Sequence, residues 1–322
     1  MIVTFTANPS IDRTVVLEGP LERGEVQRAA SVIEQAAGKG VNVARVLRLA
    51  GCPVTVVAAG IDDAFQRLAE ETRPSLEVEG QRLGSGQRVR INTTITDPSG
   101  VTTKINEAGP TLTREQLDVA SDLLLASARG AAWAALSGSL PPGAPADWYA
   151  RLIRAIKPLG CKVAVDTSDA ALDAVLAALP EASFDLIKPN SDELAQLTGG
   201  DAAAFEADAK AGRLDAIVAA ARRLQARGIG NVLVTLGGAG AVLVDADGAW
   251  YSTAPSVDVK STVGAGDSSV AGFILAEVRG GTPANCLASA VAYGSAAAGL
   301  PGSTLPRPQD AHPEHSRVTK LA

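Results

Sequence analysis

The sequence has only two histidines in 322 residues, and both lie close to its end. His312 and His315 stand in a polar, proline-rich stretch. Their absence elsewhere argues against an imidazole base, a histidine-containing metal site and a Ser-His-Asp triad. Any acid–base chemistry must therefore fall to a carboxylate.

Cysteine and positive charge are also scarce. Cys52, Cys161 and Cys286 are an odd number, widely spaced and in apolar surroundings, so we expect core residues rather than disulfides or metal ligands. The net charge of −6 and the lack of a basic run argue against nucleic acid and against a polybasic membrane contact. A small anionic substrate would have to be held by a few local cations.

Long hydrophobic runs are missing as well. The apolar stretches are short and interrupted, and no basic region precedes the opening Met-Ile-Val-Thr-Phe-Thr. We therefore expect neither a membrane span nor a signal peptide, and a cytoplasmic protein. Because 46% of the residues are hydrophobic, the chain can bury a large α/β core.

What the sequence does contain is a turn of small residues at positions 262–268. It lies between 257–259, which alternates like the end of a strand, and an apolar run with helical spacing at 269–277. Such a turn exposes unpaired backbone N–H groups at the positive end of a helix, where a phosphoryl group is stabilised. Gly264 and Gly266 let this backbone approach an anion closely.

Asp267 follows this turn at the predicted start of the helix. Two interpretations are equally good from these residues alone. An acidic residue beside a phosphate site can take a proton from an attacking hydroxyl, or it can be an ordinary N-cap.

The stretch Thr262-Val-Gly-Ala-Gly-Asp267 resembles the second signature of the ribokinase/PfkB carbohydrate kinase family. This resemblance implies that Asp267 is the catalytic base and that the backbone of Gly264, Ala265 and Gly266 is an anion hole. Four further segments of the family follow in the right order along the chain, from Ile2 to about Pro306.

The first signature is matched by Gly38-Lys39-Gly40-Val-Asn42, which turns directly into a helix predicted at 41–50. By itself the segment suits a polyhydroxylated anion or, equally, a helix entry with a solvated lysine. The resemblance implies that Gly38, Gly40 and Asn42 line a sugar and that Lys39 marks a phosphorylated one. It also assigns sugar hydroxyls to Asp12, which unaided would be a turn residue in the connection 8–14.

A β-hairpin is predicted at 87–96 and 101–106, with turn residues between its strands. The resemblance makes it part of a small β-lid, completed by strands at 15–17 and 27–32, that closes over the sugar and favours a homodimer. Arg90 matches a Thr-Arg-x-Asn element of sugar-phosphate kinases. Arg90, Lys39 and Lys104 would form a phosphate cradle, although Lys104 is equally well a solvated charge.

The rest of the chain alternates helix and strand, which predicts a doubly wound, mostly parallel sheet flanked by helices. Ser137 and Ser139 follow one strand and Asp166 ends another, where ligands of such sheets bind. Asp166 would hold Mg²⁺ through water or be structural. The resemblance implies that two further elements bind ATP and Mg²⁺. The first contains Lys188, Asn190 and Glu193, of which Asn190 and Glu193 would lie near the metal. The second contains Thr235, Gly237 and Gly240.

We expect one kinase domain at 1–306, with lid strands from about 12–32 and 87–106, and a loose polar tail at 307–322. The region 58–86 departs from the family because it lacks the glycine-rich turn of its relatives. There we expect a helix at 64–72 and a short exposed strand.

The resemblance implies an ATP-dependent kinase that phosphorylates the free primary hydroxyl of a ketohexose phosphate. Fructose 1-phosphate comes first, with tagatose 6-phosphate and fructose 6-phosphate as alternatives. A kinase for an unphosphorylated sugar or nucleoside is a rival, against which Lys39 and Arg90 argue. A catalytically inactive, sugar-responsive regulator on the same scaffold is another, against which Asp267 and its glycines argue.

Overall fold

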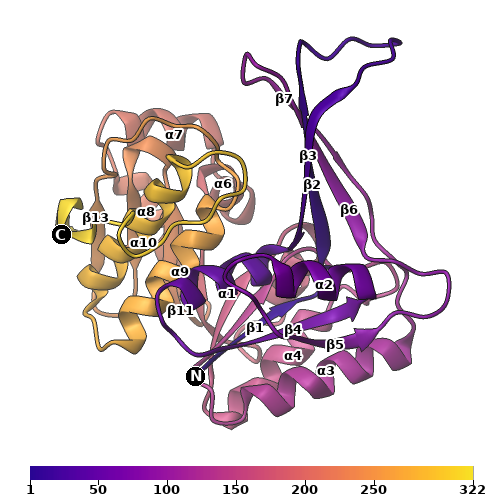
Figure 1. Ribbon diagram of the computed structural model, residues 1–322. Coiled ribbons are helices and arrows are strands. Elements are labelled where there is room, and N and C mark those ends of the chain that lie inside the picture. The colour runs from indigo at the N-terminus through magenta and orange to yellow at the C-terminus, as the bar shows by residue number, and fades with distance from the viewer. Residues whose placement is uncertain (322) are drawn as a thin grey trace.

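The computed structural model describes residues 1–321 and contains a ten-stranded, mostly parallel sheet, as predicted (Figure 1). Its strand order is β14-β13-β12-β11-β10-β9-β8-β1-β4-β5. The parallel strands are β1 (Ile2–Thr6), β4 (Val54–Ile61), β5 (Val78–Arg82), β8 (Trp133–Ser137), β9 (Lys162–Asp166), β10 (Phe184–Ile187) and β11 (Ile229–Thr235). Three antiparallel strands finish one edge: β12 (Ala241–Val244), β13 (Ala249–Ser252) and β14 (Val318–Leu321).

Helices cover both faces of this sheet, because its central strands are apolar on both sides. One face packs against α1 (Lys39–Leu49), α9 (Ala265–Val278) and α10 (Pro283–Ala298), with α2 (Asp63–Glu71) beside α1. The other face is covered by α3 (Arg114–Ala128), α4 (Trp148–Ile156), the short η1 (Lys157–Leu159), α5 (Asp169–Ala177), α6 (Ser191–Thr198), α7 (Ala202–Lys210) and α8 (Asp215–Gln225). No helix within residues 1–321 is long and apolar enough to cross a membrane.

Local signals in the sequence explain several element boundaries. Helix α3 begins at a capping box in which Thr113 and Gln116 exchange hydrogen bonds, as predicted. Strand β4 runs on through Ile61 in the region that lacks a glycine-rich turn, and the exposed strand expected after α2 is β5, which pairs with β4 at the edge of the sheet.

A second sheet of four strands projects from the body as the lid (Figure 1). Its order is β3-β2-β6-β7, with β2 at Ser10–Leu17, β3 at Ala29–Ala37, β6 at Arg90–Thr96 and β7 at Thr102–Asn106. The hairpin and the separate sheet were predicted, but the lid strands reach further into the body than expected. Asp12 therefore lies inside a strand and not in a polar connection.

The strand register gives the lid two different faces, because directly paired residues point to the same side. The polar face carries Ser10, Asp12, Arg90, Asn92 and, further out, Lys104. The opposite face, apart from the Arg13–Glu34 ion pair, is largely apolar. It carries Ile11, Val15, Val32, Ile91, Ile95 and Ile105.

Two predictions of local structure were wrong. Residues 257–259 are not a strand but part of a loop. This loop is held to α10 because the N–H groups of Lys260 and Ser261 donate to Ala298 O. The tail is not loose over the residues that the structure describes. It forms the 3-10 turn η3 (Pro313–His315) and then β14, which pairs with β13, while residue 322 lies outside the description.

Candidate active site

Helix α9 begins in the glycine turn, as predicted. Gly264 is its N-cap and has a left-handed φ of 76°, which a side chain would make unfavourable. Asp267 lies in the first turn, so the N-cap interpretation of this residue was wrong. Among the described residues no side chain caps the helix, and Ala265 N donates to Thr262 O only over a long 3.4 Å, so the N–H groups of the turn are available to a ligand.

The Asp267 side chain is buried and held by Asn42, whose Nδ2 donates to Asp267 Oδ2 at 2.9 Å. Burial, with Asp166 close by, raises the pKa of Asp267 to about 6, against the opposing effects of Lys39, Asn42 and Lys188. A carboxylate that is ionised near neutral pH but has a raised pKa is suited to accept a proton from a hydroxyl.

The charges of two lysine ammonium groups, Lys39 and Lys188, act on this carboxylate. Lys39 Nζ lies 3.0 Å from Asp166 Oδ1 at the end of β9. Lys188 lies so close to Gly266 that a Cβ there would be 3.0 Å from its Nζ. Burial alone would raise the pKa of Asp166, but the ammonium groups of Lys188 and Lys39 outweigh it and hold that pKa below its ordinary value.

The structure does not assemble the predicted cradle of Arg90, Lys39 and Lys104. Lys39 points to the Asp166 carboxylate, which is its nearest ion-pair partner, and so belongs to the Asp267 side of the site. Lys104 shares the polar face of the lid with Arg90, but it is exposed and lies on an outer rung, where it pairs with Thr94. Of the three predicted cations, only Arg90 lies close to Asp12.

Asp12 is the centre of a second polar cluster at the base of the lid. Ser10 Oγ donates to its Oδ1 at 2.8 Å and Asn92 Nδ2 donates to the same oxygen at 3.2 Å. Burial raises the pKa of Asp12, although both hydrogen bonds and the guanidinium groups of Arg90 and Arg45 act in the opposite direction. The carboxyl group is therefore fixed in place, and its oxygens can accept hydrogen bonds from the hydroxyl groups of a ligand.

Arg45 joins this cluster, and the sequence reasoning missed it. The side chain is only 3% exposed, and its Nε and Nη2 have no hydrogen-bond partner within the part of the chain that the structure describes. Burial lowers the pKa of Arg45 to about 10, and Asp12 opposes this shift. A signal was present, because an arginine on the apolar face of α1, three residues after Asn42, needs a polar reason to be there.

Gly38 and Gly40 have a packing role at the start of α1. A Cβ would lie 2.6 Å from Thr6 Cγ2 at Gly38 and 2.5 Å from Thr6 Oγ1 at Gly40. Without side chains here, α1 can approach the end of β1, and this brings Asn42 to Asp267. Ser137 is the buried last residue of β8, and Ser139 follows it in the loop at the same edge of the sheet.

The predicted nucleotide residues follow β10 and β11. Asn190 and Glu193 form the capping box of α6, in which Asn190 Oδ1 accepts from Glu193 N at 2.8 Å. Thr235 pairs with Asn190 in an isolated parallel bridge. Gly237 begins and Gly240 follows the turn η2 (Gly237–Ala239). The backbone of these turns lies at the carboxyl ends of parallel strands, where phosphate groups bind in such sheets.

The fit of a divalent cation can be judged from the carboxylates. Asp166, Lys188 and Glu193 line one narrow cavity, so two carboxylate residues, which supply the hard oxygen donors that Mg²⁺ prefers, border the same space. Asn190 and Glu193 each use one side-chain oxygen in the capping box of α6, since Asn190 Oδ1 accepts from Glu193 N and Glu193 Oε2 accepts from Asn190 N. The second carboxylate oxygen of Glu193 and the carboxylate of Asp166 are the groups that fit the cation.

The chain resembles known proteins over nearly its whole length. A family model described as pfkB family carbohydrate kinase matches residues 6–310. A 1-phosphofructokinase of Rhodobacter capsulatus is 37% identical over 311 residues, 96% of this chain and 93% of that protein. A 1-phosphofructokinase of Haloferax volcanii is 32% identical over 324 residues, which cover 100% of this chain and 99% of that protein. A crystal structure of phosphofructokinase-2 from Escherichia coli, in complex with substrates and products, is 28% identical, with a TM-score of 0.84 over 96% of both chains.

Proposed function

This chain belongs to the pfkB family of carbohydrate kinases and is a phosphotransferase similar to 1-phosphofructokinases, and from this premise we propose its substrate and mechanism. The proposed reaction transfers the γ-phosphoryl group of ATP to the free primary hydroxyl of a ketohexose phosphate. Fructose 1-phosphate, which would give fructose 1,6-bisphosphate, is the substrate that the names of the relatives favour.

Asp267 is the proposed base. It accepts the proton of the substrate hydroxyl while that oxygen forms a bond to the γ-phosphorus and the bond to ADP breaks. Asn42 holds the carboxylate in one orientation through its 2.9 Å hydrogen bond. The N–H groups of Gly264, Ala265 and Gly266 and the Lys188 ammonium next to them stabilise the negative charge that develops on the transferred group.

The polar face of the lid base holds the sugar phosphate. Asp12 accepts hydrogen bonds from sugar hydroxyls, and Arg90 with Arg45 supplies positive charge for the phosphate already present on the substrate. Mg²⁺ bound near Asp166 and Glu193 would neutralise charge on the nucleotide phosphates. Lys39 neutralises Asp166, and this leaves Asp267 as the proton acceptor.

One observation carries this proposal: a buried carboxylate with a raised pKa lies in the first turn of a helix whose N-cap is glycine. A coupled kinase assay with fructose 1-phosphate, tagatose 6-phosphate, fructose 6-phosphate and fructose tests the substrate. We expect the highest kcat/KM with fructose 1-phosphate and very low turnover of fructose. Equal use of fructose and its phosphates would contradict the assignment of Arg45 and Arg90 to a phosphate.

Fructose 6-phosphate is the second candidate. A crystal structure of phosphofructokinase-2 from Escherichia coli in complex with fructose-6-phosphate is 27% identical to this chain, with a TM-score of 0.81. A higher kcat/KM for fructose 6-phosphate than for fructose 1-phosphate would place this chain's specificity with that protein.

We also propose that the chain forms a homodimer through its lid. The apolar face leaves Val32 54% and Ile105 57% exposed on a sheet that projects from the body. A second copy of the same face would remove these side chains from water, as is usual for a two-fold interface.

A further inference from the structure

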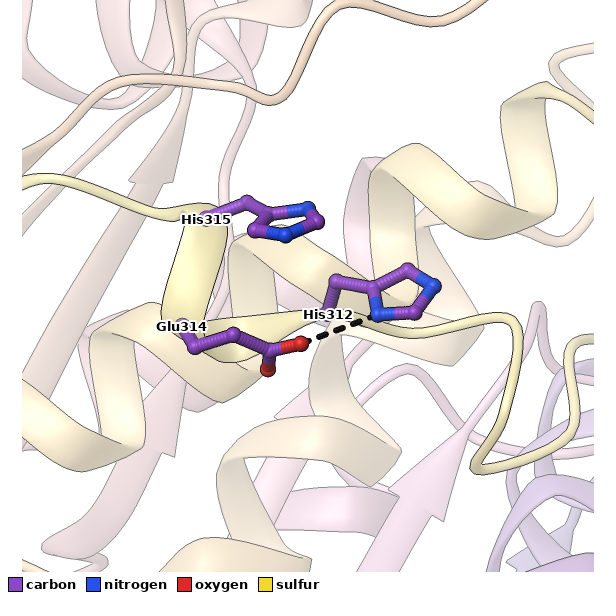
Figure 2. Close-up of side chains that lie close together, drawn as sticks. All are labelled: His312, Glu314 and His315. Carbon is purple, nitrogen blue, oxygen red and sulfur yellow. Dashed lines mark hydrogen bonds and ion pairs between the residues drawn. The ribbon is translucent and has the colours of Figure 1, made fainter.

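Both histidines of the chain meet in a single turn near its C-terminus (Figure 2). His312 and His315 lie at the two ends of η3, with Glu314 between them. Their imidazole rings are stacked, with centroids 4.9 Å apart and planes inclined by 21°. The Glu314 carboxylate reaches the first ring, with Oε1 3.0 Å from His312 Nδ1.

The ligand atoms of the three side chains all lie within 4.8 Å of one another. Two ligands of a tetrahedral ion with bonds of about 2.0–2.1 Å are themselves about 3.3 Å apart. The His312–Glu314 pair is thus already close to that separation, and His315 reaches it by a rotation of its exposed side chain. The core contains no histidine and so has no histidine-containing metal site, but both histidines of the chain lie in this turn.

The backbone of the turn is anchored on both sides. Ala311, just before it, is buried. Ser316, just after it, donates from its N to Pro313 O at 3.0 Å and from its Oγ to Ala288 O of α10 at 3.5 Å. Strand β14 then joins the sheet. Because the backbone is held, binding an ion would cost little more than the freedom of three side chains.

We propose that His312, Glu314 and His315 bind a first-row divalent transition-metal ion such as Zn²⁺, with water in the remaining positions. Two imidazoles and one carboxylate suit Zn²⁺, Ni²⁺ or Cu²⁺, whereas Mg²⁺ prefers sites made of oxygen alone. The ion ties together the two ends of η3 and so stabilises the attachment of β14 to β13. The site is separate from the proposed catalytic residues and does not depend on their assignment.

The test uses the intact protein and its small number of histidines. All imidazole signals in its NMR spectrum come from His312 and His315, so a Zn²⁺ titration reports this site directly. Excess Mg²⁺ in the buffer keeps carboxylate sites occupied. We expect the signals of both rings to shift together with one dissociation constant, and Glu314→Gln to weaken binding by at least ~10-fold.

A matched control is Glu206→Gln, since Glu206 is as exposed as Glu314, at 63% against 64%, and lies on α7. It should bind Zn²⁺ like the unmodified protein. Zn²⁺ should also raise Tm in the unmodified protein, and His312→Gln and His315→Gln should each abolish this rise. Shifts of one ring alone, unchanged affinity in Glu314→Gln, or a Zn²⁺-dependent Tm that survives both histidine variants would overturn the proposal.

Discussion

At the scale of single residues, Asp267 and Arg45 are both charged groups that the fold has taken out of water. Asp267 has compensation from Asn42, Lys39 and Lys188, while two nitrogens of the Arg45 guanidinium have no partner among residues 1–321. Buried charges without full pairing are expensive, and in proteins they gather where a ligand completes them. Helix α1 links the surroundings of the two residues, because it carries both Arg45 and Asn42, which holds Asp267.

The first prediction concerns the proposed base. Asp267→Asn should lower kcat by at least ~100-fold, because the amide cannot accept the proton, while the dissociation constant for ATP stays nearly the same. Steady-state kinetics with a nucleotide-binding titration measures both. Near-normal turnover in this variant would remove Asp267 from the mechanism.

The same substitution should change stability in a pH-dependent way. The folded-state pKa of Asp267 is raised from 3.8 to about 6, so the folded protein holds this proton more tightly than the unfolded chain. The contribution of Asp267 to stability is therefore fully present below the unfolded pKa of 3.8 and is lost as pH rises through about 6. Asp267→Asn should raise Tm at about pH 8, and its advantage over the unmodified protein should shrink at lower pH. An advantage that is independent of pH would contradict the raised pKa.

The guanidinium groups are tested as a pair. Arg90→Ala and Arg45→Met should each raise the KM for the sugar phosphate by about 10-fold or more and leave the KM for ATP unchanged, because a charged contact to the phosphate is lost. An unchanged KM in Arg90→Ala would exclude Arg90 from the phosphate site. If Arg45→Met lowers only Tm, Arg45 is a structural residue.

The sequence predicts a site residue well when its signal lies in neighbouring residues, and poorly when its role depends on a partner far away in the chain. Asp267 was found because it follows a glycine turn that can be read locally, although its role as base stays a prediction. Arg45 was missed because the helical spacing of its neighbours describes a core face, and only the folded lid brings Asp12 close to it. The pairing of Lys39 with Asp166 also joins residues far apart in the sequence, which spacing cannot show.

At the scale of elements, the position of α1 sets the geometry of the site. The helix carries Lys39, Asn42 and Arg45 on successive parts of its length, and the glycines at its start allow it to pack against β1. A small displacement of this one helix would therefore move an Asp267 partner and an Asp12 partner together.

A substitution at Gly40 tests this dependence. In Gly40→Ala the new Cβ would lie 2.5 Å from Thr6 Oγ1 and 2.9 Å from Phe5 O, so α1 has to shift. We expect a loss of stability of about 1–3 kcal/mol and a higher KM for the sugar phosphate. Gly19→Ala, whose Cβ would meet nothing within 4 Å, is the matched control and should leave both unchanged. Normal kinetics in Gly40→Ala would show that the position of α1 is not critical.

Elements with strong local signals were predicted well, and those that depend on distant partners were not. The capping box fixed the start of α3, and alternation with turn residues found the hairpin of β6 and β7. Val257-Asp258-Val259 alternates too, but among the described residues it pairs with no strand and forms part of a loop. Strand β14 is only four residues long, Val-Thr-Lys-Leu, and lies in a polar, proline-rich stretch, and it is a strand because β13 offers it a free edge.

At the scale of the whole molecule, the lid is where a second copy is expected. Val32→Lys and Ile105→Lys place a charge on its apolar face and should shift a dimer towards monomer, as measured by analytical ultracentrifugation. Ile33→Lys is the matched control, because Ile33 is 60% exposed but lies on the polar face of the lid, where it pairs with Thr14. Dissociation by Ile33→Lys alone, or a monomeric unmodified protein, would argue against this interface.

The two-sheet architecture was the most predictable property of the chain, because alternating helices and strands and one polar hairpin are enough to indicate it. The order of ten strands, with three antiparallel ones at an edge, was beyond such patterns, since it depends on pairings between segments far apart in the chain.

Helix α1 has a final consequence for how substrates of different length are told apart. Asn42 and Arg45 stand three residues apart on one rigid helix, which sets a spacing of about 4.5 Å along its axis. Movement of the lid would not alter that spacing, and because Asn42 holds Asp267, we expect Asp267 and Arg45 to keep a constant offset when the lid moves. In the proposed mechanism, discrimination by the size of the sugar would then begin before closure, and closure would add the contacts of Asp12 and Arg90 and exclude solvent.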